Sequence, residues 1–354
     1  MKHMIFGESH GPAIGVVLSG VPAGIELDME EIAFEMGRRA PGKNALSTAR
    51  KEADHPEILS GVFEGRTTGT PLCAIIQNCD QHSKDYAKTK DLARPGHADF
   101  TGYMRYEGYN DYRGGGHFSG RLTAPLVFAG AVAKQILLQE GVRIGAHIKS
   151  VAGIEDGGSF LDFQDILDAR KMVEIAHKAF PVLDDAKGAE MQKAILLAKE
   201  HLNSVGGVIE CAVMGLPAGL GAPDYGENVE GIVAQHMFAI PAVKGIGFGA
   251  GFGLAEMQGS EANDAFYMKG LDVRTKTNYN GGVNGGITNG MPVVFQVAMR
   301  PTPSIAQEQD TIRMDTLENA KIRIEGRHDP CIVHRAVPVI EAAAALAVCE
   351  LLGI

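Results

Sequence analysis

The chain has 354 residues, of which 45% are hydrophobic, and this length and composition allow a large buried core. Its formal net charge of -10 argues against a general binder of nucleic acid or anionic membranes, because such partners need a basic surface. The longest uninterrupted apolar stretches, Ala124 to Ala133 and Ala342 to Cys349, are shorter than the roughly 20 helical residues that cross a bilayer. We therefore expect a globular protein without a membrane span.

The N-terminal residues give no sign of export, and the cysteines give no sign of a metal site. The first residues, MKHMIFGESHG, lack the basic and apolar regions of a secretory leader, which favours a cytoplasmic location. The five cysteines form no CxxC pair and follow no metal-ligand spacing, so we expect buried reduced thiols; they are Cys73, Cys79, Cys211, Cys331 and Cys349.

The periodicity of apolar residues predicts four principal helices. In chain order they cover Met29 to Arg39, Pro125 to Gln139, Ala189 to Leu202 and Pro338 to Leu352. The last of these is apolar on most sides and is expected to be buried.

Two runs rich in β-branched and apolar side chains are bounded by turn residues and predict strands. They are Val208 to Met214 and Pro292 to Met299. Strands and helices do not alternate regularly, and no repeat or linker is evident, so a doubly wound sheet is not favoured. We expect an α+β fold in which residues 1–354 form one domain, with a peripheral insertion near Ile154 to Lys193.

Glycine is unusually abundant, at 45 of 354 residues against a usual share of about 7%. The glycines gather at Gly114 to Gly116, Gly245 to Gly253 and Gly281 to Gly290. Such clusters suit backbone that turns sharply or approaches a ligand, although ordinary loops account for about half of them. The second cluster imitates a dinucleotide fingerprint, but no helix or βαβ unit follows, so we reject a Rossmann site.

Several short motifs combine glycine with groups that move protons or bind anions. The segment Phe6 to Gly11 carries a carboxylate, a hydroxyl and an imidazole, and His97 follows Arg94 by three residues. Histidine transfers protons near neutral pH, and arginine binds carboxylate or phosphate through two hydrogen bonds. Taken singly, each motif is as typical of a polar turn as of a site.

Three further segments repeat this combination. Asp111 to Arg121 holds three consecutive glycines flanked by arginines, before a predicted helix whose N-terminus favours anions. Asn280 to Gly290 leads through a strand to Arg300-Pro301-Thr302-Pro303-Ser304, and Gly326 to Cys331 places Arg, His and Asp side by side. On an acidic chain, these clusters predict one convergent pocket for a ligand with several negative charges.

The ordered motifs resemble those of the chorismate synthase family over nearly the whole chain. They read GESHG, SGVFEGRTTGTP, RPGHADFTG, DYRGGGHFSGR, GGVNGGITNG, RPTPSI, GRHDPC and RAVPV. The resemblance implies a β-α-β sandwich with helices between antiparallel sheets, a homotetramer, and one reduced FMN per active site. NADPH or an external reductase would supply the electrons.

The implied reaction is a 1,4-anti elimination of phosphate from 5-enolpyruvylshikimate 3-phosphate, which gives chorismate. Phosphate leaves C3, a proton leaves C6, and the reaction is redox-neutral overall. It is the last common step of the shikimate pathway to the aromatic amino acids.

The resemblance also implies roles for individual residues. His10 would bind the substrate and protonate the departing phosphate, and His97 would lie by the reduced flavin and manage its charge. Ser9 and Asp329 match the pair proposed to relay a proton away from the flavin. The anionic substrate would also meet Arg94, Arg121 and Arg327. Cofactor contacts fall on His117, Phe118, Ser119, Pro241, Ala242, Gly285, Arg300, Pro301, Thr302, Pro303, Ser304 and Arg327.

This sequence departs from the family pattern at a few positions. Ala45 stands where arginine is frequent, with Lys43, Arg50 and Lys51 nearby, and His82, His117 and Leu122 replace the commoner Arg, Arg and Glu. We therefore expect a less basic pocket. Only Met1 to Ile5 precede the FGESHG motif, so Ser9 and His10 are expected to be less firmly held.

Two other classes of function remain open on the sequence. An NAD(P)H-using flavin oxidoreductase would share the FMN site and pass hydride onward, although support for a nicotinamide site is poor. An oligomeric phosphometabolite-binding protein would use the same arginines, with the histidines as structural residues.

Overall fold

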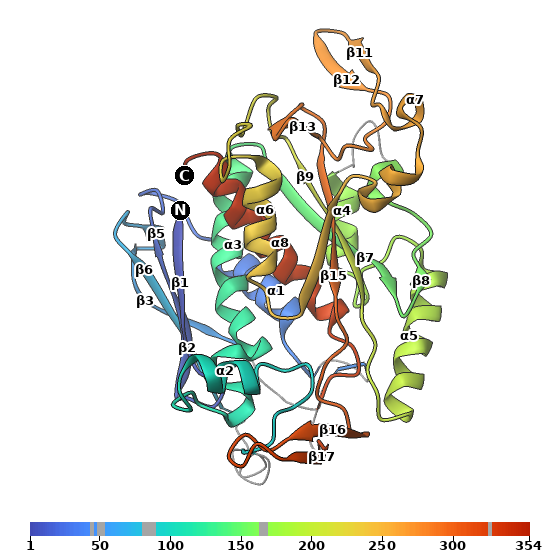
Figure 1. Cartoon of the computed structure of the whole chain (residues 1–354). Helices are drawn as coiled ribbons and strands as arrows, with labels where there is room; N and C mark the ends of the chain where they lie inside the picture. The colour runs from blue at the N-terminus through green and yellow to red at the C-terminus, as the bar shows by residue number, and fades with distance from the viewer. Residues whose placement is uncertain (43–45, 48–53, 80–89, 163–168, 325–327) are drawn as a thin grey trace.

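The computed structural model describes residues 1–42, 46–47, 54–79, 90–162, 169–324 and 328–354. Lys43, Ala45, Arg50, Lys51, His82 and Arg327 lie outside these ranges. Two antiparallel sheets enclose a layer of helices (Figure 1), which confirms the predicted α+β sandwich.

The first sheet has four strands in the order β1-β2-β6-β3, all antiparallel. The strands are β1 (Lys2–Gly7), β2 (Ala13–Ser19), β6 (Leu72–Gln77) and β3 (Pro56–Ser60). Ile14, Val16 and Leu18 alternate along β2 and are fully buried, as expected of a strand with one face on the core. The short N-terminal segment thus forms a strand that pairs with β2 along its length.

The second sheet has five strands in the order β10-β15-β9-β7-β8. The strands are β10 (Val243–Phe248), β15 (Val293–Met299), β9 (Gly207–Met214), β7 (Arg143–Val151) and β8 (Ile154–Glu155). Adjacent residues such as Val293, Val294 and Phe295 are all buried, because both faces of the sheet are covered.

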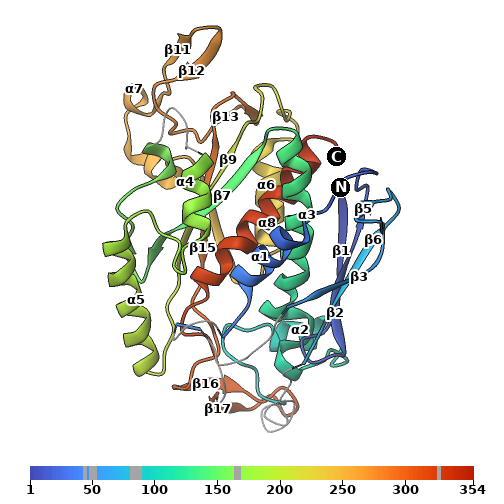
Figure 2. The ribbon, with the colours of Figure 1, turned by 180° about the vertical axis from the view of Figure 1, so that it is seen from behind.

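The helical layer contains α1 (Met29–Arg39), α3 (Thr123–Gln139), α6 (Val229–Phe238) and α8 (Val333–Leu351). Figures 1 and 2 show these helices between the sheets from opposite sides. Gly130 of α3 packs against Ala342 of α8 so closely that a Cβ at residue 130 would overlap it. The core therefore depends on small residues where α3 and α8 meet.

The helical stretch Gly120–Gln139 is long and apolar enough to cross a membrane by length and composition alone. In the fold, 78% of its apolar window is buried inside the protein. Helices that are apolar all round are typical of protein cores as well as of membranes. Here the stretch is the central core helix.

The segment predicted as a peripheral insertion covers the outer face of the five-stranded sheet (Figure 1). It includes η4 (Phe160–Asp162), α4 (Ala169–Ala176) and the start of α5 (Asp185–Glu200). Phe160 and Ile175 pack with Ala212 and Val294 in a small second core. Beneath them, fully buried His147 contacts Asp156 at 3.0 Å and Glu210 at 2.9 Å.

The remaining elements are short and lie between or beside the layers. The hairpins are β4 (Val62–Phe63) with β5 (Arg66–Thr67), β11 (Phe266–Lys269) with β12 (Asp272–Thr275), β13 (Val283–Asn284) with β14 (Ile287–Thr288), and β16 (Glu308–Ile312) with β17 (Asn319–Arg323). The short helices are α2 (Asp99–Arg105), η2 (Arg113–Phe118), η3 (Gly120–Leu122), η5 (Gly251–Glu256) and α7 (Gly259–Ala262).

The predicted elements exist, with some shifted ends. The helix Met29–Arg39 has the predicted bounds, because Asp28 caps its first turn by accepting from two backbone N–H groups. The last helix begins at Val333, and Pro338 lies inside it rather than at its start. Buried thiols are confirmed for Cys211, Cys331 and Cys349, whereas Cys73 is half-buried and Cys79 is exposed.

Candidate active site

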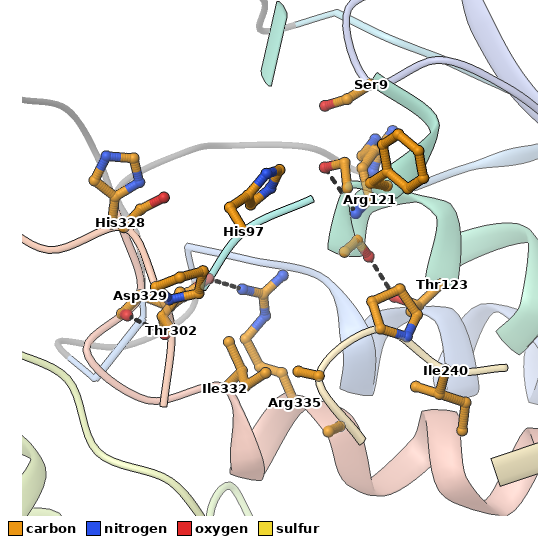
Figure 3. Close-up of a pocket in the computed structure, with 18 of the residues that line it drawn as sticks. Ser9, His97, Arg121, Thr123, Ile240, Thr302, His328, Asp329, Ile332 and Arg335 are labelled. Carbon is orange, nitrogen blue, oxygen red and sulfur yellow. Dashed lines mark hydrogen bonds and ion pairs between the residues drawn. The ribbon is translucent and has the colours of Figure 1, made fainter. Parts of the chain in front are cut away.

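A cavity of about 270 Å³ lies where the two sheets, α1, α8 and several glycine-rich turns converge (Figure 3). Its walls come from the turn after β1, the end of α1, the turn before α2, η2 and η3, the residues flanking β10 and β15, and the start of α8. Segments far apart in the sequence thus contribute to one pocket. This is the convergent site that the motifs predict.

The turn after β1 carries Ser9 and His10 into the pocket, and both are buried. Asn78 holds this turn, since its Nδ2 donates to the carbonyl of Glu8 at 3.0 Å and to that of Gly11 at 2.9 Å. Ser9 N also donates to the carbonyl of Gly116 at 3.2 Å. The turn is therefore fixed on two sides, contrary to the expectation that it would be loosely held.

Arg94, Pro95, Gly96 and His97 form a type II turn that brings the Arg94 and His97 side chains together. His97 N donates to the carbonyl of Arg94 at 3.0 Å, and Gly96 has φ of 70°. Proline at the second position and glycine at the third are the residues that such a turn prefers. Burial lowers the pKa of the His97 imidazole, which keeps it neutral at neutral pH.

The glycine run of η2 brings backbone close to both histidines. Gly114, Gly115 and Gly116 all have positive φ, which only glycine adopts at little cost. A Cβ on Gly114 would overlap the His10 ring, and one on Gly115 would lie 3.0 Å from Nε2 of His97. Larger residues here would push the histidines out of place.

A buried carboxylate, Asp54, joins two arginines that line the pocket. Its Oδ2 accepts from Arg39 Nη1 at 2.7 Å, and its Oδ1 accepts from Arg121 Nη1. Burial acts to raise the pKa of Asp54, but the two guanidinium groups outweigh burial and hold the pKa below its usual value. Burial also lowers the pKa of Arg39 to about 10, so this group keeps its charge at neutral pH.

The opposite wall is built around the start of α8. Arg335 donates from Nη1 to Asp329 at 2.7 Å and from Nε to the carbonyl of Arg39 at 3.1 Å. Thr302 Oγ1 donates to the carbonyl of Asp329 at 2.8 Å. These bonds tie the Thr302 segment and the end of α1 to one helix.

The pocket is electropositive within the described ranges. Five arginines line it, namely Arg39, Arg94, Arg121, Arg300 and Arg335. Asp329 is the one acidic lining residue among those described, and it is paired with Arg335. Charge-assisted hydrogen bonds from such arginines suit a ligand with phosphate and carboxylate groups.

Most of the residues singled out in the sequence line this cavity. They are Ser9, His10, Arg94, His97, Phe118, Ser119, Arg121, Pro241, Ala242, Arg300, Thr302, Pro303, Ser304 and Asp329. His97 lies between Ser9 and Asp329 in Figure 3, so those two side chains do not meet directly.

Three predicted contacts are not among the lining residues, and a fourth lies outside the described ranges. His117 is exposed and its Nδ1 lies 2.9 Å from the carbonyl of Gly7, while Pro301 is exposed and does not line the cavity, although its neighbours Arg300 and Thr302 do. Gly285 lies between β13 and β14, at the end of the molecule opposite β16 and β17 (Figure 1). Arg327 is the residue outside the described ranges.

Sequence reasoning gave no role to Arg39, Thr123, His328 and Arg335, which also line the pocket, although His328 belongs to one of the clusters that predict it. Arg39 and Arg335 stood in motifs already noticed, at the end of a predicted helix and in RAVPV. The missing information was spatial, because only the fold shows that both ends face the same cavity.

Comparison with known proteins identifies the family. The profile described as chorismate synthase matches residues 1–352. The chorismate synthase of Dehalococcoides mccartyi is 44% identical over 346 residues, covering 98% of this chain and 93% of that protein. That of Pyrococcus abyssi is 46% identical over 351 residues, covering 99% and 95%.

A solved structure, "Crystal Structure of Chorismate Synthase", superposes with a TM-score of 0.77 at 30% identity. The match covers 99% of this chain and 91% of that chain. Sequence and fold thus agree over nearly the full length, and the chain belongs to the chorismate synthase family of lyases.

Proposed function

We propose that this enzyme removes phosphate from 5-enolpyruvylshikimate 3-phosphate by 1,4-anti elimination, to give chorismate, with reduced FMN bound. The observation that carries the proposal is the convergence of five arginines with buried His10 and half-buried His97 on one cavity. A substrate with a phosphate and carboxylates matches that charge, and the histidines supply groups that move protons near neutral pH.

One observation, independent of the arginines, supports a bound flavin phosphate cofactor in this cavity. Ser9 is 1% exposed, and its Oγ faces the cavity with no hydrogen-bond partner among the described residues. A buried hydroxyl without a partner is costly unless a ligand satisfies it. When bound, reduced FMN would supply an electron transiently to the departure of the phosphate and recover it.

The cofactor would be held by the segments that line the cavity from η2 and from the ends of β10 and β15. These contacts are Phe118, Ser119, Pro241, Ala242, Arg300, Thr302, Pro303 and Ser304. Ala242 has φ of 75°, and its carbonyl accepts from Arg300 N at 3.0 Å, so a strained turn is fixed against the next strand. Gly285, His117, Pro301 and Arg327 remain predicted contacts.

The chain's own groups would bind the substrate and handle protons. Arg39, Arg94 and Arg121 would hold the phosphate and carboxylates, and His10 would donate a proton to the departing phosphate oxygen. Neutral His97 would accept a hydrogen bond or a proton beside the cofactor. Because Ser9 and Asp329 lie apart on opposite sides of His97 in Figure 3, we propose a proton path through intervening groups rather than direct transfer between those two.

Anaerobic incubation of the protein with chemically reduced FMN and 5-enolpyruvylshikimate 3-phosphate tests this function. We expect phosphate and chorismate in equal amounts, with the flavin still reduced at the end. Stoichiometric flavin oxidation would indicate an oxidoreductase instead, and tight substrate binding without turnover would indicate a binding protein. Adding NADPH to oxidised FMN in a second assay asks whether the enzyme reduces its own flavin or needs an external reductase.

We also propose that the protein works in the cytoplasm as a homotetramer. Apolar side chains on the hairpin β11–β12 support association, since Phe266, Met268 and Val273 are exposed and Leu271 is 98% exposed. The hairpin projects from the body of the molecule (Figure 1). Light scattering during gel filtration would give four times the chain mass, and a monomer would contradict the proposal.

A further inference from the structure

Asp99, which begins α2, uses both carboxylate oxygens to join Arg94 to His97. Its Oδ2 accepts from the Arg94 backbone N at 3.0 Å and from Nε at 2.7 Å. Its Oδ1 accepts from Arg94 Nη2 at 2.7 Å and lies 2.7 Å from His97 Nδ1. All three side chains are at most 14% exposed, so water competes little with these contacts.

This geometry favours a proton on Nδ1 of His97. Nδ1 lies in ion-pair contact with Oδ1 at 2.7 Å, and a carboxylate oxygen only accepts, so an attractive contact at this distance requires the proton on Nδ1. Nδ1 also lies 3.1 Å from Arg94 Nη2, a group that only donates. Because Nδ1 cannot donate to Asp99 and accept from Arg94 at once, the shorter, charge-assisted contact decides the tautomer.

The other ring nitrogen then faces the cavity as an acceptor. His97 projects into the cavity in Figure 3, and Nε2 lies by the backbone of Gly115, where an added Cβ would be 3.0 Å away. Nε2 makes no hydrogen bond with any of the described residues. A neutral imidazole with a proton on Nδ1 presents a lone pair at Nε2.

We propose that Asp99 is a positioning residue that holds His97 as the Nδ1–H tautomer, so that Nε2 presents a hydrogen-bond acceptor to a ring N–H of the bound ligand. The same carboxylate would stabilise the imidazolium whenever Nε2 takes up a proton. The inference rests on the proposed function for the identity of the ligand, but not for the tautomer.

The tautomer is measured on the protein without substrate or cofactor. In protein labelled with ¹⁵N-histidine, two-bond ¹H–¹⁵N correlation at about pH 8 distinguishes protonated from unprotonated ring nitrogens, and the spectrum of His97→Gln assigns the His97 signals. We expect a protonated Nδ1 and an unprotonated Nε2. A protonated Nε2 in the native protein would overturn the inference, even if no variant of Asp99 folds.

Asp99→Asn should invert the tautomer. Two donors from Arg94 face Oδ2 and only one faces Oδ1, so the amide oxygen takes the place of Oδ2, and the amide NH₂ then donates to Nδ1. We expect Nε2–H in the spectrum and a fall in kcat of about tenfold or more, as orienting carboxylates of catalytic histidines show larger losses. Asp315→Asn, in an exposed pair with Arg313, is the matched control with unchanged kcat.

The outcomes separate this inference from the function itself. An unchanged tautomer with reduced kcat would mean that Asp99 acts through Arg94, and an inverted tautomer with unchanged kcat would mean that the tautomer is irrelevant; either overturns the proposal. Failure of the native enzyme to form chorismate would overturn the proposed function and leave the tautomer result standing.

Discussion

Asp54 is the residue on which the arginine wall of the pocket depends. It is 2% exposed, has φ of 50°, and bridges Arg39 and Arg121, two cations that would otherwise face each other in a buried place. Strained backbone of this kind is retained where the surrounding contacts enforce it, and it is frequent at functional sites.

Asp54→Asn should destabilise the fold by about 3 kcal/mol, because it leaves two buried guanidinium groups without a full counter-charge. Chemical denaturation measures the loss. Inorganic phosphate should restore more stability to this variant than to the native protein, by supplying the missing negative charge. The control is Glu26→Gln, whose pair with Arg66 is exposed and should contribute less than about 1 kcal/mol. Equal losses in the two variants would contradict the bridging role.

Gly114 is the glycine whose replacement should affect the chemistry most directly. Gly114→Ala places a methyl group on the His10 ring, at a backbone φ of 59° that alanine resists. Displacing a reacting group by about 1 Å can cost ~100-fold in rate, so we expect a fall in kcat of that order in the chorismate assay. Gly253→Ala, with open space around its added Cβ, should behave like the native enzyme. A kcat within twofold of native for Gly114→Ala would exclude His10 as the proton donor in this position.

At the residue scale, sequence reasoning succeeded where the residues that act together lie within a few positions of each other in the sequence. The RPGHAD segment is one example, since its turn brings Arg94 and His97 together locally. It missed Arg39, because the relevant contact joins the end of α1 to Gly120 and Thr123 across 81 and 84 residues of sequence. Side-chain direction at a helix end follows from tertiary packing and not from local pattern.

At the scale of elements, the close approach of α3 and α8 sets the thickness of the helical layer. Gly130→Ala should cost about 1–3 kcal/mol, because the added methyl overlaps Ala342 and the two helices must move apart. Leu138→Ala, on an exposed position of the same helix, is the control and should change stability by less than about 0.5 kcal/mol. Thermal unfolding compares the two, and a Gly130→Ala protein as stable as the native one would show that the layer can adjust.

The periodicity of apolar residues predicted α1, α3 and α8 of the helical layer but not α6, and it did not predict the topology around them. Met29–Arg39 has both a capping residue and an amphipathic pattern, so its bounds are fixed locally. The strand order β10-β15-β9-β7-β8 is not encoded in any segment, because it arises from pairing between distant strands. Gly285 shows the same limit. Its motif stands in the same order as in the family and predicts a cofactor contact, but the motif does not reveal that Gly285 lies outside this chain's own cavity.

At the scale of the whole molecule, buried ion pairs link the layers and make stability depend on pH. Glu341 of α8 accepts from Arg38 at 2.6 Å, from Lys134, and from the backbone N of Ala146 on β7 at 3.0 Å. Burial acts to raise the pKa of Glu341, but the two cations lower it to about 2. Its contribution is therefore complete above the unfolded pKa of about 4.3 and is lost as pH falls toward 2.

Denaturation between pH 7 and pH 2 should show this loss, and Glu341→Gln should flatten it while lowering stability at pH 7 by about 3 kcal/mol or more. Exposed Glu57→Gln is the control and should leave the pH dependence unchanged. Identical acid profiles for native protein and Glu341→Gln would contradict the assignment of the acid-side loss to Glu341.

On the alkaline side, the carboxylates of Asp156 and Glu210 outweigh the effect of burial and raise the pKa of His147. The stability that His147 contributes is complete below its unfolded pKa of about 6.5 and is lost as pH rises through the folded value.

We propose that residues 1–354 unfold as one domain, because a single core cluster runs from β2 through α3 and α8 to β15. Scanning calorimetry should then give one endotherm. Two separated transitions would indicate that one of the sheets, with its share of the helical layer, is an independent unit.

The burial of α3 against α8 has a consequence for synthesis. The apolar stretch Gly120–Gln139 leaves the ribosome long before the residues of α8 that cover it, so a growing chain carries a segment resembling a membrane span without one of the helices that bury it. Contacts between segments so distant in sequence form slowly and late. We therefore expect chains that stop before α8 to expose this stretch and to aggregate rather than to form a partly active enzyme.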